Sequence, residues 1–224
     1  MNERLRSEDE TSLQSPSSMT SVLYFHGFSS SPASAKITAL RPLLAPYGIV
    51  LNTPDLNVPS FEKLDFDAIV DHALDVARRD PPRAMVGSSL GALVALSVAR
   101  RGVHVPLVLL APALGIAHRW KEKIPAGDPV ILYNHARGAD APIHRAFFDQ
   151  MANLHVDDEP PASRVTVIMG RQDESVPFDV VAKTWERWSA SVAPGSKFIE
   201  LAEGDHGLVA HADVIRDAIV EAAS

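Results

Sequence analysis

The sequence predicts an α/β fold, a mostly parallel sheet with helices on both faces. Short β-prone runs alternate with longer runs in which apolar residues recur at helical spacing. The run Val105–Leu110 (VPLVLL) is apolar throughout, which is typical of a strand buried on both faces. Strands that alternate with helices indicate βαβ units, and the strands of such units lie parallel in one sheet.

The expected elements follow in order along the chain. Six strands are expected, at Ser21–Phe25, Gly48–Leu51, Ala84–Val86, Val105–Leu110, Val165–Met169 and Lys197–Leu201. The first helix is expected to open at Ser31-Pro32, because Ser is a favoured N-cap and Pro a favoured first helical residue. The later helices are expected at Phe66–Arg79, Ser89–Arg101, Phe178–Ser191 and Ala210–Ala222, from the spacing of their apolar residues.

Residues 115–163 break this alternation. The stretch is polar and contains prolines and four histidines, with one helical piece expected around Ile143–Leu154. It also carries more large apolar residues than a solvated loop needs. We expect an insertion, part of which forms a small cap over a cleft at the carboxyl ends of the strands, with Phe148 and Met151 contributing to the pocket beneath it. The alternative is that the same residues pack on the edge of the sheet as ordinary core.

Length and composition limit the class of protein. The 224 residues fit one domain of ordinary size, and 46% hydrophobic residues suffice for a sizeable core. A formal net charge of −7 gives no general attraction to nucleic acid or anionic lipid. Cysteine is absent, which excludes disulfides, thiolate metal sites and a cysteine nucleophile. No apolar run approaches the roughly 20 residues needed to span a bilayer.

Residues 1–18 are charged and rich in serine, and we expect a disordered tail ahead of one domain at 19–224. The segment lacks the apolar stretch of about 7–15 residues that a secretory signal requires. We therefore expect a cytoplasmic protein. The sequence does not indicate the oligomeric state.

The segment Gly87-Ser88-Ser89-Leu90-Gly91 matches the pattern G-x-S-x-G. A short apolar strand leads into it and a long apolar helix leads out, which is the strand–turn–helix setting of a nucleophile elbow. Ser89 would then be the nucleophile, on a tight turn that leaves its hydroxyl exposed. Two alternatives are a turn that merely caps the helix at Ser88, and Ser88 itself as nucleophile.

A serine nucleophile needs a base, and the base needs an acid that orients it. Candidates for both follow later strands in the expected order of acid and then histidine. Asp173 follows the strand Val165–Met169, and His206 stands between Asp205 and Gly207 after the last strand. Glu174 is the competing acid beside Asp173, but the spacing to Val176-Pro177 favours Asp173. Asp205 adjoins His206, and the side chains of neighbours usually diverge.

The reaction also needs backbone N–H groups to stabilise the oxyanion. Leu90, directly after the nucleophile, should supply one, and Phe28, in the loop after the first strand, the other. In the same loop, Gly27 gives the backbone freedom near the substrate. His26 is expected to fix the loop at the substrate-binding site and not to act as a second base.

Three strings of residues carry a resemblance to a known family. YFHGFSSSPASAK (Tyr24–Lys36), PDLN (Pro54–Asn57) and VGSSLGA (Val86–Ala92) resemble the YqiA/YcfP-type small esterases of the α/β-hydrolase superfamily. The resemblance extends over residues 20–224, apart from the insertion at 115–163. It implies the α/β-hydrolase fold, a Ser-His-Asp esterase or thioesterase and no cofactor. By position it assigns Ser89, His206 and Asp173 to the triad, and Phe28 and Leu90 to the oxyanion hole.

The sequence thus predicts a serine esterase that cleaves carboxylic esters of small molecules through an acyl-serine. The alternatives are a thioesterase, an acyltransferase, or a ligand-binding protein of the same fold with slow turnover. The histidines show no H-x-H or H-E-x-x-H spacing, so no metal site is predicted. No Gly-rich nucleotide-binding loop is present. Neither the natural substrate nor its acyl-chain length follows from the sequence.

Overall fold

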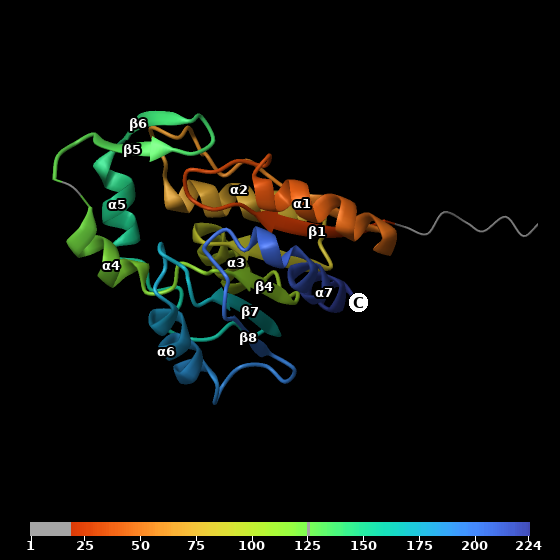
Figure 1. Cartoon of the computed structure of the whole chain (residues 1–224). Helices are drawn as coiled ribbons and strands as arrows, with labels where there is room; N and C mark the ends of the chain where they lie inside the picture. The colour runs from red at the N-terminus through yellow and green to blue at the C-terminus, as the bar shows by residue number, and fades with distance from the viewer. Residues whose placement is uncertain (1–18, 125) are drawn as a thin grey trace, which may run out of the picture.

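The computed structural model describes residues 19–124 and 126–224 (Figure 1). Six strands form one wholly parallel sheet in the order β2-β1-β3-β4-β7-β8. Their bounds are β1 Thr20–Phe25, β2 Ile49–Asn52, β3 Ala84–Ser88, β4 Leu107–Leu110, β7 Val165–Gly170 and β8 Lys197–Leu201. The α/β class with a parallel sheet is confirmed. The tail expected at 1–18 lies outside the described residues.

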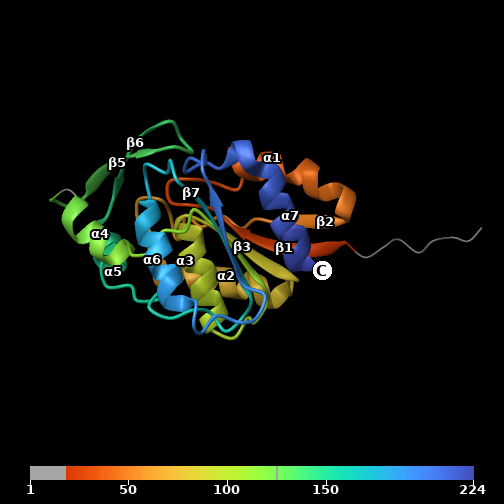
Figure 2. The same ribbon diagram turned by 60° about the horizontal axis from the view of Figure 1, so that its bottom comes forward.

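Five helices cover the two faces of the sheet (Figure 2). They are α1 (Ala35–Leu44), α2 (Phe66–Arg79), α3 (Leu90–Arg100), α6 (Phe178–Trp188) and α7 (Ala212–Ala223). Helices α1 and α7 pack together on one face, and α2, α3 and α6 lie on the other. Two 3-10 turns, η1 (Ala45–Tyr47) and η2 (Val209–His211), follow α1 and precede α7.

Local sequence explains why these helices form and what they bury. In α2, Asp65 caps the N-terminus, its carboxylate accepting from the Ala68 N–H at 2.9 Å, and one face of the helix is buried. Helix α3 is apolar on nearly every side, because it packs against β1, β3, β4 and α2. Burial of each large apolar side chain contributes about 1.5–3 kcal/mol to folding.

The first helix begins three residues later than expected. Its N-cap is Ser34 and its first residue Ala35, whereas Ser31-Pro32 was expected at these positions. Residues 31–34 instead form a turn, in which the Ser34 N–H donates to the Ser31 carbonyl at 3.1 Å. The Ser31 hydroxyl also accepts from the Ala33 N–H at 3.3 Å, so this side chain stabilises the turn and not a helix end.

The insertion at 115–163 holds four elements. Helix α4 (Ile116–Lys123) is followed by an antiparallel hairpin of β5 (Val130–Asn134) and β6 (Ala139–Ile143), and by α5 (Arg145–Met151). The helical piece expected around Ile143–Leu154 corresponds to α5, whereas the other three elements were not expected. All four lie together beyond the carboxyl ends of the sheet strands (Figure 1).

The order of the strands predicts a ligand-binding crevice at the carboxyl ends of β1 and β3. The chain moves from β1 to β2 on one side and then to β3 on the other, so the direction of winding reverses between β1 and β3. Loops that follow two such neighbouring strands diverge and leave a crevice in which ligands bind. Ser89 follows β3 and the His26–Phe28 loop follows β1, so both stand at this crevice.

Candidate active site

Ser89 lies on a sharp turn between β3 and α3 with a strained backbone. Its φ is 54° and its ψ is −115°, a backbone conformation that residues other than glycine rarely adopt. Two hydrogen bonds hold it there: its N–H donates to the Leu110 carbonyl at 2.9 Å, and its carbonyl accepts from Ala113 at 3.1 Å. Strain of this kind costs about 1–3 kcal/mol and is characteristic of functional residues.

The two glycines of the motif allow the close packing around this turn. A Cβ added to Gly87 would lie 2.4 Å from the Gly91 carbonyl oxygen, and one added to Gly91 would lie 2.2 Å from the Phe25 carbonyl oxygen. Both distances are far inside van der Waals contact and involve backbone atoms that have little room to move. The G-x-S-x-G pattern is therefore required by the packing of β1, β3 and α3.

Asp173 and His206 meet at the end of the β7 and β8 loops. The His206 Nδ1 lies 2.8 Å from Asp173 Oδ2, and the Asp173 side chain is fully buried. The second oxygen, Oδ1, accepts from the backbone N–H groups of Ser175 and Val176 at 2.8 and 2.7 Å. Glu174 is exposed, and Asp205 accepts from the Leu208 N–H at 2.7 Å. Of the three nearby acids, Asp173 is the one that contacts His206.

These contacts keep Asp173 ionised. Burial acts to raise the pKa of its carboxyl group, but the hydrogen bonds from His206 and Val176 outweigh it, and the pKa is lowered. A buried carboxylate on Nδ1 leaves the other ring nitrogen, Nε2, available as a base. The His206 side chain is about one-third exposed (32%), so Nε2 can be reached from the cavities beside it.

Two cavities meet at Ser89 and His206. The Trp120 cavity, of about 310 Å³, is lined by residues that include Ser89, Leu90, His206, Arg119, Trp120 and Leu132. The Lys36 cavity, of about 440 Å³, is lined by residues that include Ser89, His206, Gly27, Tyr24, Lys36 and Ser88. No hydrogen bond joins Ser89 Oγ to His206 Nε2 among the described residues. Such bonds are often long in unliganded sites and tighten only in the complex.

The loop after β1 brings Gly27 and Phe28 against Ser89. A Cβ added to Gly27 would lie 3.3 Å from Ser89 Cβ, so the backbone of this loop borders the serine directly. Neither the Phe28 nor the Leu90 N–H has an acceptor within the described part of the chain, and Leu90 is the first residue of α3. Both amides belong to residues that line the Trp120 cavity beside Ser89.

An aromatic cluster connects this loop to the insertion. The Phe28 ring lies 5.8 Å from the Phe147 ring in a stacked arrangement, and 5.6 Å from the Trp120 ring edge-on. Phe148 contacts both, at 6.5 Å from Phe28 and 5.4 Å from Trp120. Ser29 adds polar contacts, since its hydroxyl donates to the Tyr133 carbonyl at 2.8 Å and accepts from the backbone N–H of His135 at 2.9 Å, both in or beside the hairpin.

The insertion therefore lines the cavity at Ser89, but through residues other than those expected. Its cavity-facing residues come from α4 and the hairpin, namely Ile116, Arg119, Trp120, Leu132, Tyr133 and His135. Phe148 and Met151 are buried, at 2% and 0% exposure, and line neither cavity. Phe148 lies behind Phe28 and Trp120, which do line the cavity.

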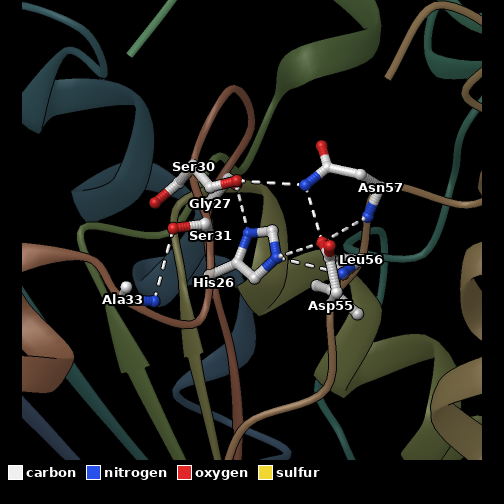
Figure 3. A network of polar contacts seen from close by, with 8 residues as sticks. All are labelled: His26, Gly27, Ser30, Ser31, Ala33, Asp55, Leu56 and Asn57. Atoms are coloured by element: carbon white, nitrogen blue, oxygen red, sulfur yellow. Dashed lines mark hydrogen bonds and ion pairs between the residues drawn. The ribbon is translucent and has the colours of Figure 1, made fainter. Parts of the chain in front are cut away.

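His26 fixes the loop, as its network shows (Figure 3). Its Nε2 accepts from the Leu56 N–H at 3.0 Å, and its Nδ1 lies 2.9 Å from the Gly27 carbonyl. Burial lowers the pKa of this histidine, against the opposing effects of Gly27 and Asp55, so the ring is neutral with its proton on Nδ1. Both ring nitrogens are thus engaged, and His26 tethers the PDLN segment while forming part of the Lys36 cavity wall.

Among the described residues, no group of three or more His, Asp or Glu side chains is placed to hold a metal ion. Within the same part of the chain, no helix has the length and apolar character needed to cross a bilayer. The cytoplasmic location expected from the sequence stays a prediction.

Comparison with known proteins decides the family. Residues 21–218 match a family described as "Uncharacterised protein family (UPF0227)". The chain belongs to this family. No curated protein gave a significant match. The YqiA/YcfP-type resemblance seen in the sequence agrees with UPF0227 membership.

Solved structures confirm the α/β-hydrolase fold of this UPF0227 protein. Est1E from Butyrivibrio proteoclasticus, solved with ferulic acid, has a TM-score of 0.72 at 18% identity, over 91% of this chain and 88% of that one. Mouse alpha/beta hydrolase domain-containing protein 10 gives 0.72 at 19% identity, over 90% and 88%. The esterase domain of a Rhodothermus marinus protein gives 0.69 at 14% identity, over 93% and 90%.

Two cations near Ser89 were not predicted from the UPF0227 sequence. Lys36 lines the Lys36 cavity and Arg119 lines the Trp120 cavity. The Arg119 guanidinium donates to the Ser175 carbonyl, while its buried Nε has no hydrogen-bond partner within the described residues. For Lys36 a signal exists, because it is spaced four and eight residues from Leu40 and Leu44 on the buried face of α1. For Arg119 we find no such signal, since its helix was not expected.

Proposed function

We propose that this UPF0227 protein is a serine hydrolase that cleaves carboxylic esters of small molecules through an acyl-serine intermediate. The observation that carries the proposal is the Asp173–His206 pair, joined at 2.8 Å, whose histidine lines the same two cavities as a serine on a strained turn. The fold and the named esterases among its structural neighbours support the same reaction class. The proposed reaction requires no cofactor.

Each proposed step uses one of these groups. The Ser89 hydroxyl attacks the ester carbonyl carbon while His206 Nε2 accepts its proton, and Asp173 stabilises the resulting imidazolium. The N–H groups of Phe28 and Leu90 donate to the oxyanion of the tetrahedral intermediate. Collapse of that intermediate breaks the bond to the alcohol, which takes the proton from His206. Water then attacks the acyl-serine with His206 again as base, releasing the acid and restoring Ser89.

The insertion is proposed to select the acyl group. Trp120 and Leu132 provide an apolar wall beside Leu90, where an acyl chain bound to Ser89 and held by the oxyanion hole can lie. Phe148 and Met151, proposed from the sequence as pocket residues, would act from behind this wall. Any effect of Phe148 on acyl selection would be transmitted through its contacts with Phe28 and Trp120.

Kinetics on matched variants tests the proposal. Ser89→Ala should lower kcat/KM on p-nitrophenyl acetate by several orders of magnitude, whereas Ser88→Ala, one residue away on the same turn, should retain turnover. Parallel assays with an acyl-thioester separate an esterase from a thioesterase. Near-normal activity of Ser89→Ala would contradict the mechanism. Absence of turnover in the wild-type protein would favour a ligand-binding role.

A further inference from the structure

The Lys36 cavity has a polar inner wall that the proposed reaction does not use. Tyr24 on β1, Lys36 on α1 and Ser88 at the end of β3 line it, beside Ser89 and His206. All three side chains are buried, at 1%, 8% and 8% exposure. A cluster of buried polar groups that opens on a catalytic serine is a candidate for substrate recognition.

Lys36 brings a positive charge to this wall. Its ammonium group donates to Ser88 Oγ at 2.9 Å and to the His206 carbonyl at 3.4 Å. An ammonium group has three N–H donors, so one donor remains for a ligand. Within the described part of the chain Lys36 forms no ion pair, although the carboxylates of Asp173 and Asp205 act on it from a greater distance.

The charge persists at neutral pH although the group is buried. Burial lowers the pKa of Lys36 to about 8, with Asp173 and Asp205 acting in the opposite direction. A buried ammonium group without a contacting carboxylate opposes folding, and a neutral donor such as glutamine could hold Ser88 at less cost. The presence of a lysine at this buried position therefore points to a ligand with negative charge.

Tyr24 supplies a second, independent observation. Its hydroxyl group is buried and forms no hydrogen bond of normal geometry among the described residues, although the Ser88 side chain lies near enough to act on it. Burial raises the pKa of Tyr24 well above its ordinary value, against a smaller opposing effect of Ser88, so the group remains a donor. Leaving a buried hydroxyl without an acceptor disfavours the unliganded protein, and a bound acceptor would remove this cost.

The N-terminus of α1 also favours negative charge at this wall. Ser34 and Ala35 line the Lys36 cavity, and the Ser34 side chain does not cap the helix. The first N–H groups of a helix carry partial positive charge and favour anions nearby. The wall thus combines a lysine, a donor hydroxyl and a helix N-terminus.

We propose that Tyr24, Lys36 and Ser88 bind a carboxylate of the substrate, so that the preferred substrates are esters that carry a free carboxylate close to the scissile bond. Two kinds of ester meet this description: half-esters of dicarboxylic acids, with the charge in the acyl part, and esters of hydroxy acids, with the charge in the alcohol part. This inference rests on the proposed esterase function and names its substrate class.

Two pairs of substrates of similar size test the inference on the wild-type protein, with acid release followed in a pH-stat. Monoethyl succinate is compared with ethyl pentanoate, and acetoxyacetate with propyl acetate. We expect kcat/KM to be at least tenfold higher for the anionic member of one pair, and that pair identifies the side of the ester that carries the charge. Equal or lower values for both anionic esters would overturn the inference.

Two variants connect the preference to the proposed residues. Tyr24→Phe removes a hydroxyl that forms no hydrogen bond of normal geometry in the unliganded protein, so it should fold normally, and we expect the anionic-to-neutral ratio of kcat/KM to fall at least threefold. Tyr47→Phe, at an exposed tyrosine, is the matched control and should leave the ratio unchanged. Lys36→Gln should reduce the ratio at least tenfold. A loss of both activities in equal proportion would show instead that Lys36 only positions the His206 loop.

A further measurement separates failure of this inference from failure of the esterase proposal. Binding of propionate and of propionamide to the wild-type protein is followed by calorimetry, which needs no turnover. We expect propionate to bind at least tenfold more tightly than the amide, and this difference to be lost in Lys36→Gln. Equal binding of the two, with ester turnover intact, would refute the carboxylate site and leave the esterase proposal standing.

Discussion

Replacement of Lys36 by Met should make the protein more stable at neutral pH. The pKa of Lys36 is lowered from 10.5 to about 8 in the folded protein. At about 1.4 kcal/mol for each pH unit between these values, keeping the buried ammonium protonated lowers the free energy of unfolding by about 3 kcal/mol. Methionine keeps most of the stem but removes the donor to Ser88 and the longer hydrogen bond to the His206 carbonyl, together a loss of about 1–2 kcal/mol. The net gain expected at pH 7 is therefore about 1–2 kcal/mol.

The gain should depend on pH with a defined sign. Below pH 8 both folded and unfolded wild-type chains hold the Lys36 proton, so the full penalty is present. Between about pH 8 and 10.5 the folded chain releases the proton while the unfolded chain keeps it, and wild-type stability rises. The advantage of Lys36→Met should consequently vanish by about pH 10.

Urea unfolding of both proteins at pH 7 and at pH 10 measures this difference. Titration of Tyr24 and of every other group is common to the two proteins and cancels in the comparison. A Lys36→Met protein that is less stable than wild type at pH 7, by an amount that does not change with pH, would refute the reasoning. Lys36 would then contribute to stability through its hydrogen bonds alone.

Further predictions concern the triad and the insertion. Asp173→Asn should lower kcat by up to about 10⁴-fold in ester assays, because the amide no longer sets the His206 tautomer; a loss below tenfold would count against the triad. Ser89→Gly should raise the free energy of unfolding by about 1 kcal/mol in urea titrations, because glycine adopts this φ without strain; a less stable variant would contradict the strain argument. Trp120→Ala should shift kcat/KM towards longer acyl chains on a p-nitrophenyl ester series, whereas an unchanged chain-length profile would place the acyl group elsewhere.

The sequence could predict those parts of the site that depend on local chain geometry. The elbow requires small residues around Ser89 whatever the rest of the molecule does, because Gly91 meets the Phe25 backbone. The order of nucleophile, acid and histidine follows from the order of the strands that carry them. Asp173 and His206 each follow a recognisable strand, so their meeting at one edge of a parallel sheet could be anticipated.

Features that depend on long-range packing could not be predicted in the same way. The first helix begins later than expected because Ser31 and Pro32 favour a turn as readily as a helix, and the side chain of the distant Asn57 donates to the Ser30 carbonyl beside this turn. Lys36 is of a residue type that is usually exposed. Its spacing from Leu40 and Leu44 indicates the buried face of α1, but its contacts with Ser88 and the His206 loop follow only from the packing of the fold. Phe148 is a large aromatic residue that could line a pocket, but it packs behind Trp120. Residue type alone does not show whether an aromatic side chain lines a cavity or lies behind its wall.

Covalent labelling of Ser89 tests the central claim most directly. A fluorophosphonate reacts with an activated serine and needs neither a particular acyl chain nor a carboxylate. Mass spectrometry of the digested wild-type protein should locate one label on Ser89, with labelling abolished in Ser89→Ala, strongly slowed in His206→Ala and retained in Ser88→Ala. A label on another residue, or ester turnover that continues in a protein whose Ser89 remains unlabelled, would contradict the account.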